Sequence, residues 1–446
     1  MKRQIDDYAD VLAYLDTNDL DQETRTINLR ECKFNFSLDL DLLFHTLWNK
    51  YYEFDYLDFS DSIFQGSVEL CMTNQQSVNN DKNNFIGFNY LKTKIKIEMD
   101  FSSCQFIDAV RFSGVEFSRD LNFINAVFEK KVELSELVFK GYLRLFEASF
   151  HDDVNFANLE LNDKSIFYTN NDDRTKFEGN LYFFNIVFLK AKFWDFVFSK
   201  NVYFLNTVFD CPALFNNAKF LGKTVFSSVE TIGLTEFKNK LYFDNAEFND
   251  LNLDKLVFEK VVSFNYATIK NISIDNVHCF GFPMSLVGTS IGNVKNEGTA
   301  RFLKSEAMKS NDPFLIAELN TKEMNMHYKG LSWTKKEFFD KLIFFLNKNS
   351  TNFGNRWEKG VLFIFLSWIF SFSLIVMLRD GIGMTFIWSD KDYKKESVDF
   401  LWKFGSLDIL GNYSCWAYIF VFIIGKILIA YGVYQTITAF RKYGRK

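Results

Sequence analysis

Large apolar residues recur through the middle of the chain in steps that alternate between five and six residues. The series runs without a break from Phe101 to Phe167 and resumes at Phe177, after an interruption over residues 168–176. Neither an α-helix, with its period of 3.6 residues, nor a plain strand, with its period of 2, produces this spacing. A chain that turns a corner after each short strand does produce it. We therefore expect a four-sided solenoid with about 22 residues in each coil.

The recurring residues are expected to point into the solenoid and to form its core. A second series of mostly smaller apolar residues lies two positions before the large ones, as at Ala126 and Ala148. This pattern also accounts for the 55 Phe of the chain, which outnumber its 21 Gly and 3 Pro together. The predicted core phenylalanines are Phe101, Phe106, Phe112, Phe117, Phe123, Phe128, Phe139, Phe150, Phe156, Phe204, Phe209, Phe215, Phe220, Phe243, Phe248, Phe258 and Phe264.

Segments such as FINAVFEKKVEL, FEASFHDDVNF and FNNAKFLGKTVF resemble the pentapeptide-repeat family, in the variant that alternates phenylalanine-centred units of five and six residues. The resemblance implies a right-handed quadrilateral β-helix, in which the large residue and the small residue before it point inward. With a strand spacing of roughly 4.8 Å, about eight coils would form a rod about 40 Å long.

Weaker copies of the same spacing precede the regular repeat. Residues 27–34 and 57–70 are expected to form further coils separated by insertions, and residues 74–84, rich in Asn, Gln, Ser and Lys, predict a loop. Because the end of a solenoid exposes unpaired strand edges, residues 6–15 are expected to form a capping helix.

Two long apolar segments in the last quarter of the chain are predicted membrane spans. Residues 360–378 carry no charge, and as a helix their 19 residues cover about 28 Å of the roughly 30 Å hydrocarbon core. Residues 416–437 are apolar except for Lys426 and Gln435, and aromatic residues lie toward both ends, as is typical at membrane interfaces. We expect the two segments to form a helical hairpin in the bilayer.

A helical connector is expected between the repeat and the first span. Residues 299–330 have helical apolar spacing, and Pro313 divides them into two helices because it lacks an amide hydrogen. Residues 335–348 form an amphipathic pattern, with phenylalanines along one side and lysines opposite. This pattern fits a helix at the membrane interface and a helix packed against a neighbour equally well.

Basic residues predict the orientation of the spans. Lysines and arginines crowd the segment before the first span and the last residues of the chain, whereas the loop 379–415 has at least as many acidic as basic residues. Positively charged flanks stay in the cytoplasm. The first residues lack the apolar core of a secretory signal, and the six Cys are scattered without a CxxC pair. We expect a multi-pass inner (cytoplasmic) membrane protein with both termini and the solenoid in the cytoplasm.

Four residues of the second predicted span are candidates for lining a pore or for assembly, namely Lys426, Gly425, Gly432 and Gln435. A charge at the middle of a span costs roughly 3 kcal/mol, so such residues usually face a bundle interior or a wet cavity. Alternatively, Lys426 extends its amine to the interface and has only a structural role. The glycines permit close helix contact, but small residues are common in membrane helices.

The C-terminal part resembles an arrangement of bacterial pentapeptide-repeat proteins, in which an R-x-x-K and a later E-M pattern precede two spans ending in YQTI-x-AFRKY. The matching residues here are Arg301, Lys304, Glu323, Met324 and 434–443. Some relatives have a potassium-channel-like pair of spans. The loop of this chain contains GIGM and DILG but no TVGYG-like string, so potassium selectivity is not supported. The resemblance implies membrane attachment and assembly, and it leaves conduction open.

Charge and motif content argue against several other functions. The net charge of −5 and the pI of about 5.6 provide no basic field for nucleic acid. Residues 101–280 carry 24 Asp and Glu against 19 Lys and Arg, a balance too even for the strongly acidic surface of family members that imitate DNA. No catalytic triad, paired-carboxylate, HExxH, P-loop or GxGxxG arrangement is visible. We therefore expect no enzyme activity and assign no catalytic, cofactor-binding or metal-binding residue.

The sequence thus predicts a right-handed quadrilateral β-helix, an α-helical connector and a two-helix transmembrane hairpin. Its predicted function is binding or sensing by a membrane-tethered homo-oligomer, whose hairpins form a channel-like or permeabilising assembly. The expected partners are the lipid bilayer and an unknown protein on the solenoid faces. The alternative is a static scaffold that recruits a protein, and topoisomerase protection by DNA mimicry is least favoured. The expected domains are a cap with irregular coils (1–96), the regular solenoid (97–284), the connector (285–355) and the membrane domain (356–446), with spans at about 360–378 and 416–437.

Overall fold

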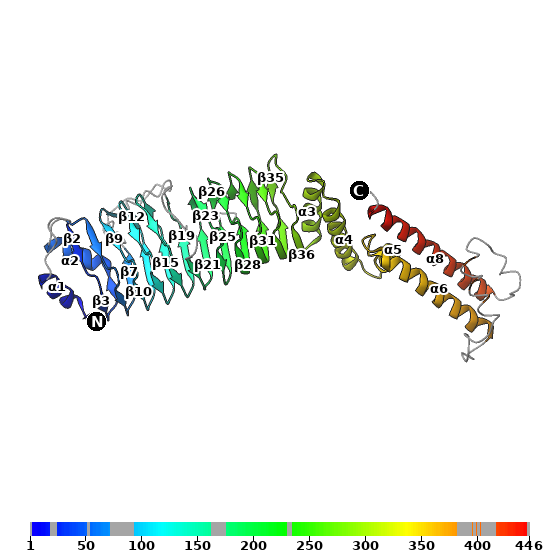
Figure 1. Ribbon diagram of the computed structural model, residues 1–446, viewed down its shortest axis with the longest axis horizontal. Coiled ribbons are helices and arrows are strands. Elements are labelled where there is room, and N and C mark those ends of the chain that lie inside the picture. The colour runs from blue at the N-terminus through cyan, green and yellow to red at the C-terminus, as the bar shows by residue number, and fades with distance from the viewer. Residues whose placement is uncertain are drawn as a thin grey trace, which may run out of the picture. The chain divides into compact units, whose positions relative to one another are not determined.

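The computed structural model of the chain describes residues 2–17, 25–50, 54–71, 93–161, 175–229, 234–380, 395, 398, 402 and 416–443. The chain divides into two compact units, Met1–Asn311 and Asp312–Lys446. The first unit contains all the strands of the described residues, and the second is helical (Figure 1).

The first unit is a β-solenoid of short parallel strands, and their pairing groups them into four stacks (Figure 1). The first stack contains β1 (Arg3–Ile5), β3 (Cys32–Phe34), β6 (Ile63–Phe64), β10 (Gln105–Phe106), β14 (Val127–Phe128), β18 (Ser149–Phe150), β20 (Lys176–Phe177) and β24 (Val197–Phe198). The second contains β4 (Leu38–Asp39), β7 (Val68–Cys71), β11 (Val110–Ser113), β15 (Val132–Ser135), β19 (Val154–Ala157), β21 (Leu181–Phe184) and β25 (Val202–Leu205).

These two stacks merge toward the C-terminal end of the solenoid, because there a single long strand replaces two short ones. The merged strands are β28 (Lys219–Ser227), β31 (Glu247–Asp254), β34 (Thr268–Asp275) and β36 (Ser290–Val294). Between β28 and β31 the register shifts between Phe220 and Lys223, which marks the former corner.

The third stack contains β8 (Thr93–Ile95), β12 (Val115–Phe117), β16 (Val138–Phe139), β22 (Val187–Phe188), β26 (Val208–Phe209), β29 (Thr235–Phe237), β32 (Leu256–Phe258) and β35 (His278–Cys279), with Glu160 bridging its two sheets. The fourth contains β2 (Thr26–Asn28), β5 (Tyr56–Asp58), β9 (Glu98–Asp100), β13 (Leu121–Asn122) and β17 (Leu143–Arg144) in one sheet. A second sheet continues it with β23 (Ala191–Lys192), β27 (Ala213–Leu214), β30 (Leu241–Tyr242) and β33 (Val262–Ser263).

Strand register gives the length of one coil. Phe106 pairs with Phe128 and Phe128 pairs with Phe150, each 22 residues further along the chain. The next partner is Phe177, 27 residues on, because the interruption of the repeat falls in this coil. The structure therefore confirms that the recurring residues occupy equivalent positions in successive coils.

One corner of the coil is built from residues in the left-handed conformation. Asn125, Asn217 and Asn245 follow strands of the fourth stack with φ of 59°, 56° and 57°. Asparagine tolerates this region better than most residues, because its short polar side chain bonds locally. The equivalent position of other coils holds Ser103, Glu147, Asp195 or Tyr266 with φ of 54–58°, so the chain turns sharply at the same place whether or not the residue is Asn.

Phenylalanine rings fill the interior of the solenoid in stacks along its length. All seventeen predicted core phenylalanines are buried, with at most 2% of any of them exposed. The rings of Phe106 and Phe128 lie 4.7 Å apart at 3°, and those of Phe128 and Phe150 lie 4.7 Å apart at 1°. Ala126 and Ala148 of the second series are also fully buried. Because equivalent residues stack at each coil, one repeat pattern generates a continuous core.

The N-terminal end contains the predicted helix and coils. The helix α1 (Tyr8–Thr17) covers most of the segment 6–15, and strands form within 27–34 and 57–70 as expected. A second helix, α2 (Leu40–Lys50), was not predicted; it packs against β7 and buries Leu43, Phe44 and Leu47. The expected loop at 74–84 lies outside the described residues.

A helix covers the C-terminal end of the solenoid. Regular strands extend past residue 284 to β36, and α3 (Glu297–Lys309) follows directly. The Thr299 hydroxyl accepts a hydrogen bond from the Ile274 amide (2.8 Å) and donates one to the Ile274 carbonyl (3.0 Å). The buried Glu306 carboxylate accepts a bond from the Met284 amide at 2.9 Å. The first helix of the expected connector is therefore part of the solenoid unit, where it satisfies backbone groups of the last coils.

The second unit contains α4 (Pro313–Gly330), α5 (Phe338–Thr351), α6 (Trp357–Asp380) and α8 (Trp416–Tyr443). The predicted break at Pro313 is present, and the Asp312 carboxylate caps α4 by accepting bonds from the Phe314 and Leu315 amides at 3.0 Å. Helices α6 and α8 contain the two predicted apolar spans and pack against each other. The loop between them, including GIGM and DILG, lies outside the described residues apart from three isolated positions.

Candidate functional site

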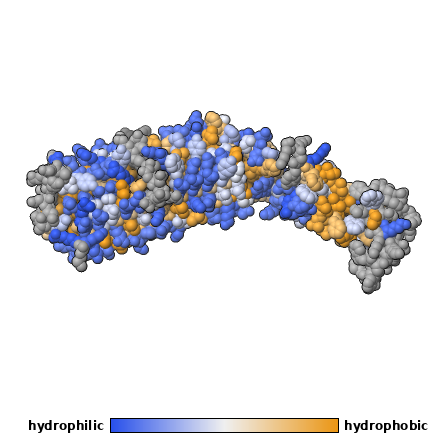
Figure 2. Space-filling model, in the orientation of Figure 1, coloured by the Kyte–Doolittle hydropathy of each residue, from blue (hydrophilic) through white to orange (hydrophobic). Residues whose placement is uncertain are grey.

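Helices α6 and α8 expose most of their large apolar side chains. Only 22% of Trp357–Ile375 and 28% of Ile419–Arg441 is buried, whereas the core helix of a soluble protein is mostly buried. Both helices are long and apolar enough to cross a membrane. Figure 2 shows the resulting apolar surface in orange on the helical unit. The exposed side chains are Trp357, Val361, Leu362, Phe365, Leu366, Phe370, Met377, Trp416, Phe420, Ile423, Ile424, Ile427, Val433, Tyr434, Ile437 and Phe440.

Small and hydroxyl-bearing residues fill much of the contact between these two helices. Ser367, Ser371, Thr436 and Ala439 are buried. A Cβ atom added to Gly432 would lie 2.7 Å from Ile364 Cγ1, so the backbones approach closely at this glycine. The buried Ile375, Phe422 and Ile429 complete the contact. Small residues where two apolar helices approach closely are typical of helices that associate in lipid.

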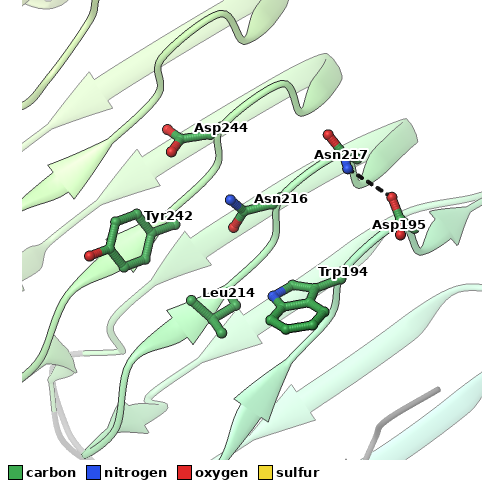
Figure 3. A pocket seen from close by; sticks show the side chains of 7 residues that line it. All are labelled: Trp194, Asp195, Leu214, Asn216, Asn217, Tyr242 and Asp244. Atoms are coloured by element: carbon green, nitrogen blue, oxygen red, sulfur yellow. Dashed lines mark hydrogen bonds between the residues drawn. The ribbon is translucent and has the colours of Figure 1, made fainter. Parts of the chain in front are cut away.

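A hollow of about 360 Å³ lies on the surface of the solenoid, at the corner after the fourth stack. Figure 3 shows that its lining comes from three successive coils, which contain β23, β27 and β30. The lining residues are Trp194, Asp195, Leu214, Asn216, Asn217, Tyr242 and Asp244. These positions are outward-facing in the repeat, so the sequence pattern places them on one surface but does not predict a hollow.

The chemistry of this hollow combines two aromatic side chains with hydrogen-bond acceptors. The Asn217 amide donates to Asp195 Oδ1 at 2.9 Å, and Asp244 Oδ1 accepts bonds from the Ser263 hydroxyl and from the Asn265 amide at 3.1 Å. Asn216 Oδ1 is buried without a hydrogen-bond donor. A buried acceptor without a donor costs free energy, so a donor supplied by a bound group would stabilise it.

The comparison with family models identifies the repeat. Residues 101–149 match the family model described as pentapeptide repeats (9 copies). This part of the chain consists of pentapeptide repeats. The matched residues cover about two coils and include the stacked rings of Phe106 and Phe128. Comparison with curated proteins and with solved structures finds no significant match.

The structure places the four candidate pore or assembly residues in different surroundings. Lys426 is partly buried, with its Nζ 5.4 Å from the centre of the Phe422 ring. Gly425 and Gly432 are buried, and Gly432 lies at the contact with α6. Gln435 is nine residues beyond Lys426, about 13 Å along the helix axis. The four residues therefore do not form one cluster within a single chain.

Gln435 belongs to a polar network that joins α8 to α5. Its Nε2 donates to Asn347 Oδ1 at 2.9 Å, and the Tyr431 hydroxyl donates to the same oxygen at 2.6 Å. The sequence predicts Tyr431 only as one of the aromatic residues near a membrane interface, and it predicts no role for Asn347. No local pattern contains this signal, because the two residues are 84 positions apart.

The described residues contain no group of three His, Cys, Asp or Glu side chains placed to hold a metal ion. Five of the cysteines are free thiols, and Cys415 lies outside the described residues. Burial raises the pKa of the Cys32 and Cys211 thiols to about 11. Thiols held protonated at neutral pH are poor nucleophiles, so their surroundings give these two cysteines a packing role.

Proposed function

We propose that this pentapeptide-repeat protein is a cytoplasmic binding or sensing rod tethered to the inner membrane by α6 and α8. The observation that carries the proposal is the outward-facing apolar surface of both helices, because a surface of this kind is unstable in water and stable in hydrocarbon. The basic flanks of the hairpin support cytoplasmic termini. The four strand stacks and the family match support a right-handed quadrilateral solenoid.

Membrane insertion is tested by alkaline carbonate extraction of membranes from cells that express the full chain. An inserted hairpin remains in the membrane pellet, whereas a peripherally bound protein is released. The variant Ile427→Lys places a charge on the exposed side of α8, and the matched variant Lys426→Arg retains the charge already present. We expect the first to reduce insertion and the second to leave it unchanged, because a lipid-facing charge costs roughly 3 kcal/mol at mid-span. Release of the wild-type chain into the soluble fraction would contradict the proposal.

We further propose that the hairpins associate into a channel-like homo-oligomer. One chain contributes two helices, which cannot enclose a pore, so conduction requires several copies. Lys426 supports this model, since a partly buried charge in a span commonly faces a bundle interior. Native mass spectrometry from nanodiscs measures the number of copies, and ion flux into liposomes measures conduction. We expect Lys426→Leu to reduce flux and Lys426→Arg to preserve it; a monomer in nanodiscs would exclude this assembly.

The second candidate function is a static scaffold that recruits a protein through the solenoid. The hollow at Trp194 and Tyr242 favours it, because aromatic side chains beside carboxylates are suited to a partner's cationic side chain. A photo-crosslinker at Leu214 in the full chain would capture such a partner in cells. The scaffold model predicts that Tyr242→Ala abolishes the crosslink, that Tyr182→Ala on the second stack does not, and that no ion flux accompanies binding.

A further inference from the structure

Helix α5 is held in a fixed orientation by contacts on two of its sides. Toward α4, the ring of Phe344 lies 5.0 Å from the ring of His327, and Lys348 Nζ lies 4.8 Å from the centre of the Tyr328 ring. Toward α8, Asn347 accepts the bonds from Tyr431 and Gln435 described above. These contacts determine which side of α5 remains uncovered within its own unit.

The uncovered side of α5 is an apolar stripe. It consists of Phe338, Phe339, Ile343 and Phe345, which are all exposed, with 73% of Phe339 accessible. Trp333, also exposed, extends the stripe, and its ring lies 5.8 Å from that of Phe338 and 6.4 Å from that of Phe345. Asp340 is exposed as well, but on the polar side of the helix.

The position and composition of the stripe indicate what covers it. Helix α5 has 14 residues, about 21 Å, which is too short to span a bilayer, and a stripe of aromatic residues is typical of a helix lying in the interface. Its bonds to α8 lie at Tyr431 and Gln435, toward the end of α8 that carries Arg441. Helix α5, which carries the stripe, therefore contacts the spans near their basic end.

We propose that α5 lies in the plane of the membrane, with the stripe of Trp333, Phe338, Phe339, Ile343 and Phe345 buried among phospholipid headgroups and upper acyl chains. The exposed Lys335 and Lys336, one turn before the helix, face the lipid phosphates. An aromatic stripe in this position fixes the depth and tilt of the hairpin. The inference rests on the proposed membrane insertion of α6 and α8 and adds a third, non-spanning membrane contact.

The test compares the depth of single nitroxide labels in the full chain reconstituted into nanodiscs. Labels are attached to Phe339→Cys, Asp340→Cys and Ile427→Cys, in a background where Cys71, Cys279 and Cys415 are replaced by Ser. Collision rates with lipid-soluble oxygen and water-soluble nickel chelate give an oxygen-to-nickel ratio for each label. Phe339, Asp340 and Ile427 are all exposed in the structure, so labelling leaves the packing intact.

We expect the oxygen-to-nickel ratio to be highest at residue 427. The ratio at residue 339 should be several-fold above that at its neighbour 340, where it should equal the ratio of a label in water. A label at 339 that resembles the one at 340, while 427 reports lipid, would overturn the inference and leave the proposed function intact. A label at 339 shielded from both reagents would also overturn it, because a protein surface such as a second copy would then cover the stripe. Water-like ratios at all three positions would contradict membrane insertion itself.

Discussion

At the scale of single residues, each core phenylalanine contributes both burial and ring stacking. Phe128 lies between Phe106 and Phe150 with both ring pairs 4.7 Å apart, so its removal opens a gap in a continuous column. Aromatic pairs contribute about 0.5–1.5 kcal/mol beyond their buried area. The solenoid has few alternatives for filling such a gap, because neighbouring coils hold the backbone at the strand spacing.

We predict that Phe128→Ala lowers the free energy of unfolding of the solenoid by about 3–5 kcal/mol, through lost burial and the cavity left behind. Leu221→Ala, at a residue that is 53% exposed on β28, is the control and should change it by less than about 0.5 kcal/mol. Urea unfolding followed by circular dichroism measures both values. Equal effects of the two substitutions would show that the stacked column does not stabilise the coils.

The buried thiols predict how the stability of the solenoid depends on pH. Burial raises the pKa of Cys211 to about 11, whereas the ordinary value is 9.0. The unfolded chain therefore loses this proton at lower pH than the folded chain, and stability present below pH 9 is lost as the pH rises toward 11. We expect the urea midpoint to fall over this range, with a smaller fall in Cys211→Ala. Burial also raises the pKa of Tyr56, which acts in the same direction and remains in the variant. An unchanged slope in Cys211→Ala would rule out the contribution of this thiol.

At the scale of elements, the structure uses two different ways to bring backbones together. In the solenoid, parallel strands stack through hydrogen bonds and place identical positions of the repeat over one another. In the helical unit, glycine and hydroxyl-bearing residues allow α6 and α8 to approach, while apolar clusters such as Ile375, Phe422 and Ile429 complete the contact. Substitutions at the glycines should therefore affect the hairpin and leave the solenoid unchanged.

We predict that Gly432→Leu weakens the packing of α6 against α8 by about 1–3 kcal/mol, because even its Cβ would meet Ile364 at 2.7 Å. Val433→Leu, one residue away on the exposed side, is the matched control and should have little effect. Titration of the nanodisc-reconstituted protein with denaturing detergent, followed by helix content, measures the difference. Identical unfolding midpoints for the two variants would contradict close packing at residue 432.

At the scale of the whole molecule, a repeat-built unit and a helical unit follow one another in a single chain. The first provides the faces of the solenoid, including the hollow at Trp194 and Tyr242, and the second provides the apolar surface. This division of chemistry supports a protein that binds a partner with one unit and lipid with the other. In the proposed topology, the compartment in which the solenoid meets its partner is the cytoplasm.

We predict that green fluorescent protein fused after Lys446 is fluorescent in bacterial cells and that alkaline phosphatase at the same position is inactive. The physical reason is the excess of basic residues on both outer flanks of the hairpin, which keeps both ends in the cytoplasm. Truncated fusions after Lys395, behind one span only, should give the opposite pair of results. Active phosphatase after Lys446 would reverse the proposed orientation.

Much of the solenoid could be predicted from the sequence because its contacts repeat locally. The spacing of Phe106, Phe128 and Phe150 already contains the coil length, and Pro313 marks a helix break through its missing amide hydrogen. The helix α2 was not predicted because it is an insertion between β4 and β5, and the spacing of the repeat contains no information on the structure of an insertion. Residues 290–294 were assigned to the connector, yet they pair with β34 as a further strand.

The sequence by itself determined the repeating coil, the inward phenylalanines and the two apolar helices, since each depends on spacing between near neighbours. Only the tertiary structure decided that Thr299 and Glu306 close the end of the solenoid, and that Asn347 joins Tyr431 and Gln435. It also decided that Trp194 and Tyr242 line one hollow and that the aromatic stripe of α5 stays uncovered. These arrangements arise between residues far apart in the chain, and short-range periodicity contains no information about which distant side chains meet.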